Sequence, residues 1–164
     1  MAADGAELHL RGATADDAEL LWQWTNDPAV RASSFSSAPI PWEEHVRWLD
    51  GVLANPDRVL WIAEGDLREP VGQVRFDRVG DHVVISVSLA STCRGRGYGP
   101  ALIGAACSKY RLSVAPVEVV AYIKDENAAS VRAFERAGFV RSGRRSSPYP
   151  RSLVLVLPAE KTHD

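Results

Sequence analysis

A glycine-rich segment between a strand-like run and a helix-like run carries the residue types that most clearly indicate chemistry. It spans residues 89–99 and reads LASTCRGRGYG. Glycines let the backbone turn sharply and present several N–H groups to one point, and the N-terminus of a following helix adds roughly half a positive charge. Arg94 and Arg96 add formal charge to the same segment. The segment therefore predicts a binding site for a phosphate group.

Two common phosphate-binding loops do not fit this segment. The Walker loop requires Gly-Lys followed by Ser or Thr, which the segment lacks, and the dinucleotide-binding pattern requires a third glycine where Pro100 stands. Short glycine patterns also recur by chance. A plain strand–helix connection with solvated arginines is therefore the alternative interpretation of this segment when it is taken alone.

A second informative segment covers residues 119–139 and reads VVAYIKDENAASVRAFERAGF. A strand-like run brings Asn127 to the start of a predicted helix, where its amide can cap the helix or hold a ligand. Gly138 is expected to end that helix in the left-handed conformation. Taken alone, this segment is an ordinary strand–turn–helix–glycine unit.

The elements that must position both segments follow from hydrophobic periodicity. We predict strands at residues 7–11, 58–64, 71–77, 82–89 and 117–123, near Phe139 and at 152–157. Helices are predicted from an N-cap at Thr14 to the Asn-Asp-Pro at 26–28, from Pro41 onward, at about 97–110 and at about 127–137. The helix after Pro41 is expected to bury a face made by residues 42, 46, 49 and 53. This order predicts an α/β fold (α+β in some schemes) with a mixed central sheet of about seven strands flanked by about four helices.

The overall composition excludes several classes of protein. The 164 residues include 19 Lys and Arg against 21 Asp and Glu, a formal net charge of −2, which argues against bulk nucleic-acid binding. No apolar run approaches the roughly 18 residues of a membrane span, and the acidic start lacks the apolar core of a secretory signal. Cys93 and Cys107 form no metal-ligand pattern. We expect one cytoplasmic domain over residues 1–164, a monomer or homodimer, with no metal, nucleic-acid or membrane partner.

The two segments together resemble the GNAT family of N-acetyltransferases, over about residues 7–157. The loop of that family reads Gln/Arg-x-x-Gly-x-Gly/Ala, which Arg94, Gly97 and Gly99 match. Its later signature, an asparagine followed by a helix and a terminal Gly-Phe, is matched by Asn127 and by residues 138–139. The resemblance implies the GNAT fold and acetyl-CoA as the acyl donor. Another acyl-CoA remains an alternative donor, because the loop recognises coenzyme A and not the acyl chain.

The resemblance also implies which residues hold the donor. Backbone groups of Val87 and Leu89 are expected to bind the pantetheine arm, and an N–H of Leu89 to stabilise the developing oxyanion as a neutral amine attacks the thioester directly. The pyrophosphate is expected to bind backbone amides of the loop, namely those of Arg94, Gly95, Arg96, Gly97, Tyr98 and Gly99; Pro100 has no N–H to offer. Asn127 and Phe134 complete the expected coenzyme site.

One position departs from the family pattern. Many members carry a tyrosine seven residues after the asparagine, which can protonate the leaving thiolate, and this chain has Phe134 there. Phenylalanine donates no proton, so this role is empty or has moved. A thiol with a pKa near about 8.5 leaves tolerably as an anion at neutral pH, which makes a general acid helpful but not obligatory. Ser130, one turn earlier on the same helix face, is the candidate substitute; an ordinary surface serine is the alternative.

The first half of the chain resembles the N-acetyltransferases that act on nucleotide-linked amino sugars in the pseudaminic acid pathway. The resemblance lies in residues 24–31 (WTNDPAVR), 42–49 (WEEHVRWL) and 71–77 (VGQVRFD). Indole faces suit a sugar or a base, and arginine forks suit a diphosphate. The acceptor contacts implied in this way are Trp24, Asn26, Arg31, Trp42, Gln73 and Arg75. Packing of the tryptophans in the core is the alternative.

The proton that the acceptor ammonium must lose has no obvious carboxylate to receive it, because Ser86, Val87 and Ser88 occupy the central strand. His45, with an unperturbed pKa near about 6.5, is the candidate base, acting directly or through water. A water chain to bulk solvent and a purely structural histidine are the alternatives.

Three other functions remain compatible with these residues. The acceptor is alternatively the N-terminus of a ribosomal protein or a peptide, or an aminoglycoside or other antibiotic. From a different class, the chain is alternatively a non-catalytic acyl-CoA-binding module, because neither the general acid nor the general base is assigned.

Overall fold

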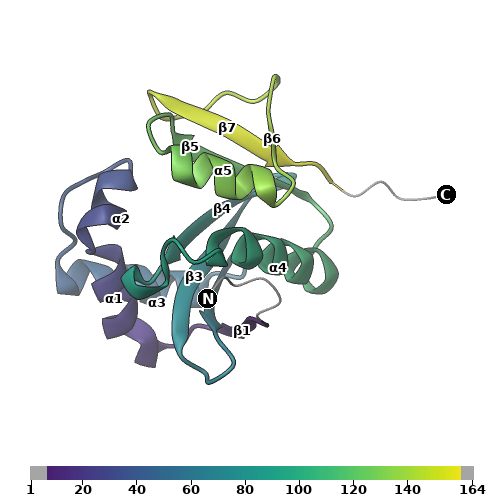
Figure 1. Cartoon of the computed structure of the whole chain (residues 1–164). Coiled ribbons are helices and arrows are strands. Elements are labelled where there is room, and N and C mark those ends of the chain that lie inside the picture. Colours follow the sequence, from purple (N-terminus) through teal and green to yellow (C-terminus); the bar gives the residue numbers. More distant parts are fainter. Residues whose placement is uncertain (1–6, 160–164) are drawn as a thin grey trace.

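A mixed seven-stranded sheet forms the centre of the structure, a computed structural model that describes residues 7–159 (Figure 1). The strand order is β1-β2-β3-β4-β5-β7-β6, and every neighbouring pair is antiparallel except β4 and β5. The strands are β1 (His9–Gly12), β2 (Arg58–Glu64), β3 (Pro70–Val79), β4 (His82–Leu89), β5 (Glu118–Lys124), β6 (Val140–Arg141) and β7 (Ser152–Leu157). The sheet confirms the predicted fold class.

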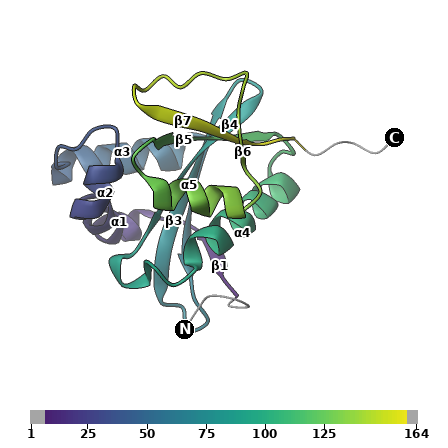
Figure 2. The same cartoon turned by 45° about the horizontal axis from the view of Figure 1, so that its top comes forward.

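Within residues 7–159 five α-helices accompany the sheet: α1 (Ala18–Thr25), α2 (Pro28–Ser33), α3 (Trp42–Ala54), α4 (Tyr98–Ser113) and α5 (Ala128–Arg136). Short 3-10 turns, η1 (Ala15–Asp17) and η2 (Ser91–Cys93), precede α1 and α4. In both views α1, α2 and α3 gather at one side of the molecule, and α4 and α5 pack against each other (Figures 1 and 2). None of the helices within residues 7–159 is both long and apolar enough to cross a membrane.

Helices α3 and α4 cover opposite faces of the sheet. Two successive residues of β3 show this, since successive side chains of a strand point to opposite faces. Phe76 of β3 stacks on Tyr110 of α4, with ring centroids 4.5 Å apart. Its neighbour Arg75 lies instead over the indole of Trp48 on α3, 5.4 Å from the ring centroid. The predicted alternation of polar and apolar residues in this strand is thereby confirmed. Its polar face is the one that meets the N-terminal helices.

Helix α2 is a finding that the sequence prediction missed. Asn26-Asp-Pro does end α1, as predicted, but Pro28 also begins a new helix, since its fixed φ suits the first helical turn. The carboxylate of Asp27 caps this helix by accepting the N–H of Ala29 at 3.0 Å. Pro28 therefore begins helix α2 as well as following the end of helix α1.

The buried face of α3 also differs from the prediction. Its buried residues are His45, Leu49 and Val52, whereas Trp42 and Leu53 are exposed. The helix is rotated relative to the predicted face because His45 finds a partner inside the protein, the carbonyl oxygen of Ala18, at 2.9 Å from Nε2. A buried polar group with a hydrogen bond is tolerated, so a histidine takes an inward position.

Candidate active site

The parallel strands β4 and β5 separate after a short paired stretch. They pair only over residues 82–84 with 118–120, although β4 continues to Leu89. The N–H of Ala90 donates to the carbonyl of Val71 at 2.8 Å, so in this antiparallel ladder residues 86, 88 and 90 face β3. Val87 and Leu89 therefore direct their backbone groups away from β3, toward the side where β5 has parted. An extended ligand can pair with them there, as a pantetheine arm would.

The glycine-rich loop follows directly on this strand end. Gly95 and Gly97 have φ values of 71° and 82°, which are left-handed conformations that side-chain-bearing residues rarely adopt. Gly97 is the N-cap residue of α4 and supplies no side-chain cap to it. The first N–H groups of α4 are consequently open to an external anion.

The sequence predicts that Arg94 and Arg96 add positive charge to a phosphate site, but in the structure both side chains contact other parts of the protein. A guanidinium nitrogen of Arg94 lies 3.0 Å from a carboxylate oxygen of Asp27, and the same nitrogen lies 3.4 Å from the carbonyl oxygen of Leu89. Arg96 donates to the carbonyl of Thr92 at 3.2 Å. Both guanidinium groups are thus engaged with the protein itself. The backbone amides of the two residues face no such competition and are the groups that we expect to meet a pyrophosphate.

Helix α5 packs against the end of the glycine-rich loop. The side-chain oxygen of Asn127 accepts the backbone N–H of Ser130 at 3.2 Å and so caps the helix, one of the two roles predicted for it. A Cβ added at Gly99 would meet the Cβ of Ala133 at 3.5 Å, which places the loop against α5. Phe134 is 5 % exposed and meets Phe139 edge to face, with centroids 5.0 Å apart. Its packing role is clear from these contacts.

A cavity of about 320 Å³ lies between the N-terminal helices and the polar face of β3 and β4. Three of the six predicted acceptor contacts line it, namely Arg31, Gln73 and Arg75. His45 lines it as well. Sequence reasoning missed further lining residues, among them Thr25, Ser34, Glu44, Trp48, Ser86 and Ser88. The alternation in residues 71–77 and 82–89 is the signal that places the strand members of this set on one face.

The other three predicted acceptor contacts do not line the cavity. Trp24 is 9 % exposed and belongs to the hydrophobic core. Asn26 uses both ends of its amide on Ile40, accepting its N–H at 2.8 Å and donating to its carbonyl at 3.0 Å. Trp42 is 39 % exposed and packs edge to face with Trp22. These three residues therefore lie outside the lining of this cavity and pack or bond within the helices around it, and their contact with an acceptor stays a prediction.

Arg75 belongs to a fixed cluster of charges on the strand side of the cavity. The two carboxylate oxygens of Asp77 accept Nε of Arg58 at 2.9 Å and Nε of Arg75 at 3.0 Å. Both guanidinium groups lie near the ring of Trp48, 6.0 Å and 5.4 Å from its centroid. The cluster holds two positive charges against one negative charge. Arg75 thus presents a positioned guanidinium to the cavity.

Arg31 is the second cationic residue of the cavity wall. It donates to the carbonyls of Thr25 at 2.6 Å and Ser36 at 2.9 Å. Burial lowers the pKa of its guanidinium, which nevertheless stays charged. These bonds tie α2 to α1 and to the segment that leads into α3. Glu44 is the one carboxylate residue among those lining the cavity, which is therefore more cationic than anionic.

His45 is only 2 % exposed but reaches the cavity wall. Burial lowers the pKa of its imidazole, an effect that the hydrogen bond to the carbonyl of Ala18 opposes in part. Since a carbonyl only accepts, Nε2 carries the proton and Nδ1 of the neutral ring is left as a proton acceptor. This is the protonation state that a general base requires.

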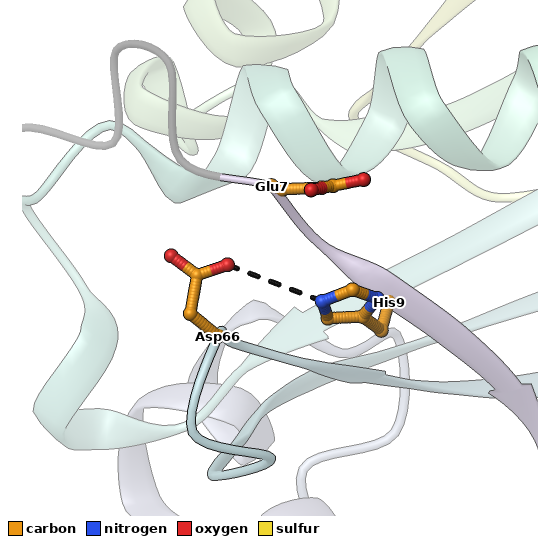
Figure 3. A group of neighbouring side chains, drawn as sticks. All are labelled: Glu7, His9 and Asp66. Carbon is orange, nitrogen blue, oxygen red and sulfur yellow. Dashed lines mark ion pairs between the residues drawn. The ribbon is translucent and has the colours of Figure 1, made fainter.

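Two further groups of chemically active side chains lie outside this cavity. Cys93 and Cys107 are buried free thiols, and burial raises the pKa of the Cys107 thiol to about 12, which makes it a poor nucleophile. Glu7, His9 and Asp66 place ligand-type atoms within 4.8 Å of one another near the start of β1 and the β2–β3 turn (Figure 3). Glu7 and Asp66 are exposed, and such groups also form ordinary surface ion pairs, so we assign no metal to them.

Comparison with known proteins agrees with this architecture. A family model described as an acetyltransferase (GNAT) domain matches residues 7–140. No curated protein sequence matches the chain. Among solved structures, spermidine N-acetyltransferase from Vibrio cholerae in complex with CoA and spermine superposes with a TM-score of 0.80 at 16 % identity, covering 92 % of this chain and 94 % of that one.

Two other solved structures are similarly close in fold. A domain from Methanocaldococcus jannaschii has a TM-score of 0.78 at 22 % identity, with 93 % of this chain and 98 % of that one covered. An aminoglycoside acetyltransferase in complex with coenzyme A and kanamycin has a TM-score of 0.79 at 20 % identity, with 93 % and 95 % covered. At these identities the likeness concerns the fold.

Proposed function

Since this chain belongs to the acetyltransferase (GNAT) domain family, we propose that it acetylates the amine of a small molecule that also carries an anionic group. The chain is an acetyl-CoA-dependent N-acetyltransferase; the proposal concerns its acceptor. The acceptor class that we favour is a nucleotide-linked amino sugar, in which a diphosphate accompanies the primary amine.

The donor side of the site suits acetyl-CoA, which supplies an activated acetyl group when bound. The backbone edge of Val87 and Leu89 that β5 leaves open would hold the pantetheine arm. The amides of residues 94–99, at the uncapped start of α4, would hold the pyrophosphate. The loop glycines are suited to this role, because their left-handed conformations turn the backbone and leave no side chain in the way.

The residues of this chain have separable roles in the proposed transfer. The N–H of Leu89 would donate to the oxyanion that develops as the neutral amine attacks. Nδ1 of His45 would take the proton of the acceptor ammonium, directly or through water. Phe134 offers no proton, so the thiolate would depart as an anion or with help from Ser130, one turn away on α5.

The proposal of an anionic acceptor rests on the charged residues that line the cavity. Two arginines and one glutamate line it. Two like charges 4 Å apart repel by about 1 kcal/mol in water and about 4 kcal/mol at an effective dielectric constant of 20. A polyamine or an aminoglycoside would bring several ammonium groups toward Arg31 and Arg75. A phosphate group would instead be attracted by both charges and would accept hydrogen bonds from Arg75, because the N–H groups of Arg31 already donate to protein acceptors.

The uncharged polar groups of the cavity suit a sugar. Gln73 donates to the hydroxyl of Ser88 at 3.0 Å, and Ser86 lies at 3.4 Å from a guanidinium nitrogen of Arg75. Each of these side chains has remaining donors or acceptors for ligand hydroxyl groups. The cavity therefore offers both a hydroxyl-binding wall and a cationic end.

The test is an acceptor panel in which charge is the variable. Release of free CoA thiol is measured with a UDP-linked amino sugar, the same amino sugar without the nucleotide, spermidine, kanamycin and a peptide with a free N-terminus. We expect kcat/KM to be highest for the nucleotide-linked sugar and to fall at least about tenfold when the nucleotide is removed. Efficient turnover of spermidine or kanamycin alone would overturn the proposal, and efficient turnover of the peptide alone would favour an N-terminal acetyltransferase.

The variant Arg75→Gln tests the same point from the protein side. It removes the charge and keeps a polar side chain, and we expect it to raise KM for the anionic acceptor about tenfold or more. Arg47→Gln, the same change at an exposed position of α3, is the matched control. An equal change of KM in both variants would show that the charge of Arg75 does not contribute to binding of the acceptor.

A further inference from the structure

The ion pair between Arg94 and Asp27 joins the coenzyme loop to the helix that bears part of the acceptor cavity. One carboxylate oxygen of Asp27, Oδ1, lies 3.0 Å from Nη2 of Arg94. The same oxygen accepts the N–H of Ala29 at 3.0 Å and thereby caps α2. The contact that begins α2 is therefore also the contact that ties α2 to the loop.

Arg94 is held on its other side by the end of the donor strand. Its Nη2 lies 3.4 Å from the carbonyl oxygen of Leu89, whose backbone faces the gap left by β5. Arg94 also directly precedes Gly95 at the start of the glycine turn. A single side chain thus contacts the strand end, belongs to the loop and reaches the cap of α2.

Helix α2 depends strongly on tertiary contacts such as this ion pair for its stability and position. It has six residues, and none of them is buried. Helices this short are marginal without tertiary contacts. Val30 and Arg31 of α2, and Ser34 at its end, line the acceptor cavity. The position of α2 therefore sets one wall of that cavity.

We propose that Arg94 is a positioning residue that couples occupancy of the coenzyme loop to the acceptor cavity through Asp27. The inference rests on the proposed function in one respect, namely that this cavity is the acceptor site. A ligand that orders residues 95–99 also fixes Arg94, and Arg94 then fixes the cap of α2. By thermodynamic linkage, coenzyme and acceptor each raise the affinity of the protein for the other by the same factor.

The size of the coupling follows from the exposure of the pair. The side chains of Arg94 and Asp27 are 35 % and 22 % exposed, so water partly screens their attraction. We therefore expect the low end of the usual range of coupling factors, about fivefold.

Asp27→Asn separates the ion pair from the helix cap. Asparagine is as good an N-cap residue as aspartate, so the variant keeps the bond to Ala29 and loses the charge that Arg94 meets. Arg94→Gln removes the other partner, and the double variant completes a cycle. Lys124→Gln is the matched control, since Lys124 of β5 donates to the carbonyl of Ala32 in α2 at 2.9 Å but lies outside the loop.

The first readout is hydrogen exchange of the α2 amides with and without CoA, which requires no acceptor. We expect CoA to slow exchange about fivefold in the unmodified protein and in Lys124→Gln, and to have no effect in Asp27→Asn, Arg94→Gln or the double variant. The affinity for CoA, measured by calorimetry without acceptor, should change by no more than about twofold in Asp27→Asn, whose substituted residue lies outside the coenzyme loop. Protection of α2 by CoA that survives in the double variant would overturn the proposal.

The second readout is the acceptor KM and kcat. Each single variant should raise the acceptor KM about fivefold, and the double variant should raise it no further. Asp27→Asn should leave kcat within about twofold. A loss of CoA affinity in Arg94→Gln without one in Asp27→Asn would overturn the proposal, because Arg94 would then act on the coenzyme directly. If the exchange results hold and no small amine is acetylated, the acceptor proposal fails and the coupling stands.

Discussion

The rings of Phe35 and Tyr149 stack with centroids 3.9 Å apart and planes within 7° of parallel. Phe35 lies in the segment between α2 and α3, and Tyr149 lies in the connection between β6 and β7. Tyr149 also meets Tyr122 of β5 edge to face, at 5.9 Å. The stack therefore links the helical side of the acceptor cavity to the half of the sheet beyond the β4–β5 gap.

Removing the Tyr149 ring should loosen this link. A stacked aromatic pair contributes about 0.5–1.5 kcal/mol beyond the area it buries. We expect Tyr149→Ala to lower the free energy of unfolding in urea by about 1 kcal/mol and to raise the acceptor KM. Tyr149→Phe keeps the ring and serves as the control, which should leave both quantities unchanged. A change of the same size in both variants would assign the effect to the hydroxyl.

The left-handed conformation of Gly97 leads to a second prediction. A Cβ at this position strains the backbone by about 1–2 kcal/mol and stands where a pyrophosphate would approach. Gly97→Val should therefore weaken CoA binding at least about tenfold by calorimetry. Gly80→Val is the control for strain, because Gly80 has a φ of 62° in the β3–β4 turn, with open space around it. Unchanged CoA affinity in the folded Gly97 variant would contradict the assignment of the loop.

The sheet and the loop could be predicted because their signals are local. The strands at 58–64, 82–89 and 152–157 begin and end as predicted, since apolar, β-branched runs bounded by turn residues define them within the segment itself. The left-handed conformation of Gly138 was likewise predicted, because this glycine ends a helix, whereas that of Gly97 is a finding of the structure.

The acceptor side could be predicted only in part, because its determinants are tertiary. Whether Asn26 faces a ligand or the backbone of Ile40 depends on where the α2–α3 segment returns. The inward turn of His45 depends on a carbonyl 27 residues away. The pairing of Arg94 with Asp27 likewise joins segments that no local pattern connects.

Burial of His45 predicts a specific dependence of stability on pH. Above about pH 6.5 the ring is neutral in both the folded and the unfolded state. As the pH falls below that value, the unfolded chain takes up a proton that the folded protein refuses, because burial lowers the pKa of His45. The free energy of unfolding should therefore decrease from about pH 6.5 down to the folded-state pKa.

His45→Gln tests this dependence, since its amide can still donate to the carbonyl of Ala18. Urea unfolding at several pH values between 5 and 7 should show a smaller decrease for this variant than for the unmodified protein. If His45 is also the general base, kcat/KM of the unmodified protein should decrease as the pH falls over this range, and kcat/KM of His45→Gln should not show this decrease. A rate profile unchanged by the substitution would assign deprotonation to water.

Ser130 gives a prediction about the leaving group. It stands one turn before Phe134 on α5, and its backbone N–H is held by Asn127. General acid catalysis contributes about 10²–10⁴-fold, so a true proton donor at Ser130 would lower kcat by that factor when changed to alanine. We expect Ser130→Ala to lower kcat less than about tenfold under saturating substrates. A larger fall, at unchanged CoA affinity, would make this serine the acid.

Phe134 is where the two accounts of thiolate departure can be separated. Its buried contact with Phe139 predicts that Phe134→Leu lowers the free energy of unfolding by about 1–3 kcal/mol and affects kcat little. Phe134→Tyr adds a hydroxyl to the same ring. If the thiolate leaves unaided and its protonation is not limiting, kcat at saturating substrate stays unchanged. A marked rise in kcat would mean that protonation limits the native enzyme. Because an unchanged kcat also results when the hydroxyl misses the sulfur, a crystal structure of the variant with CoA decides, through the distance between the Tyr hydroxyl and the thiol.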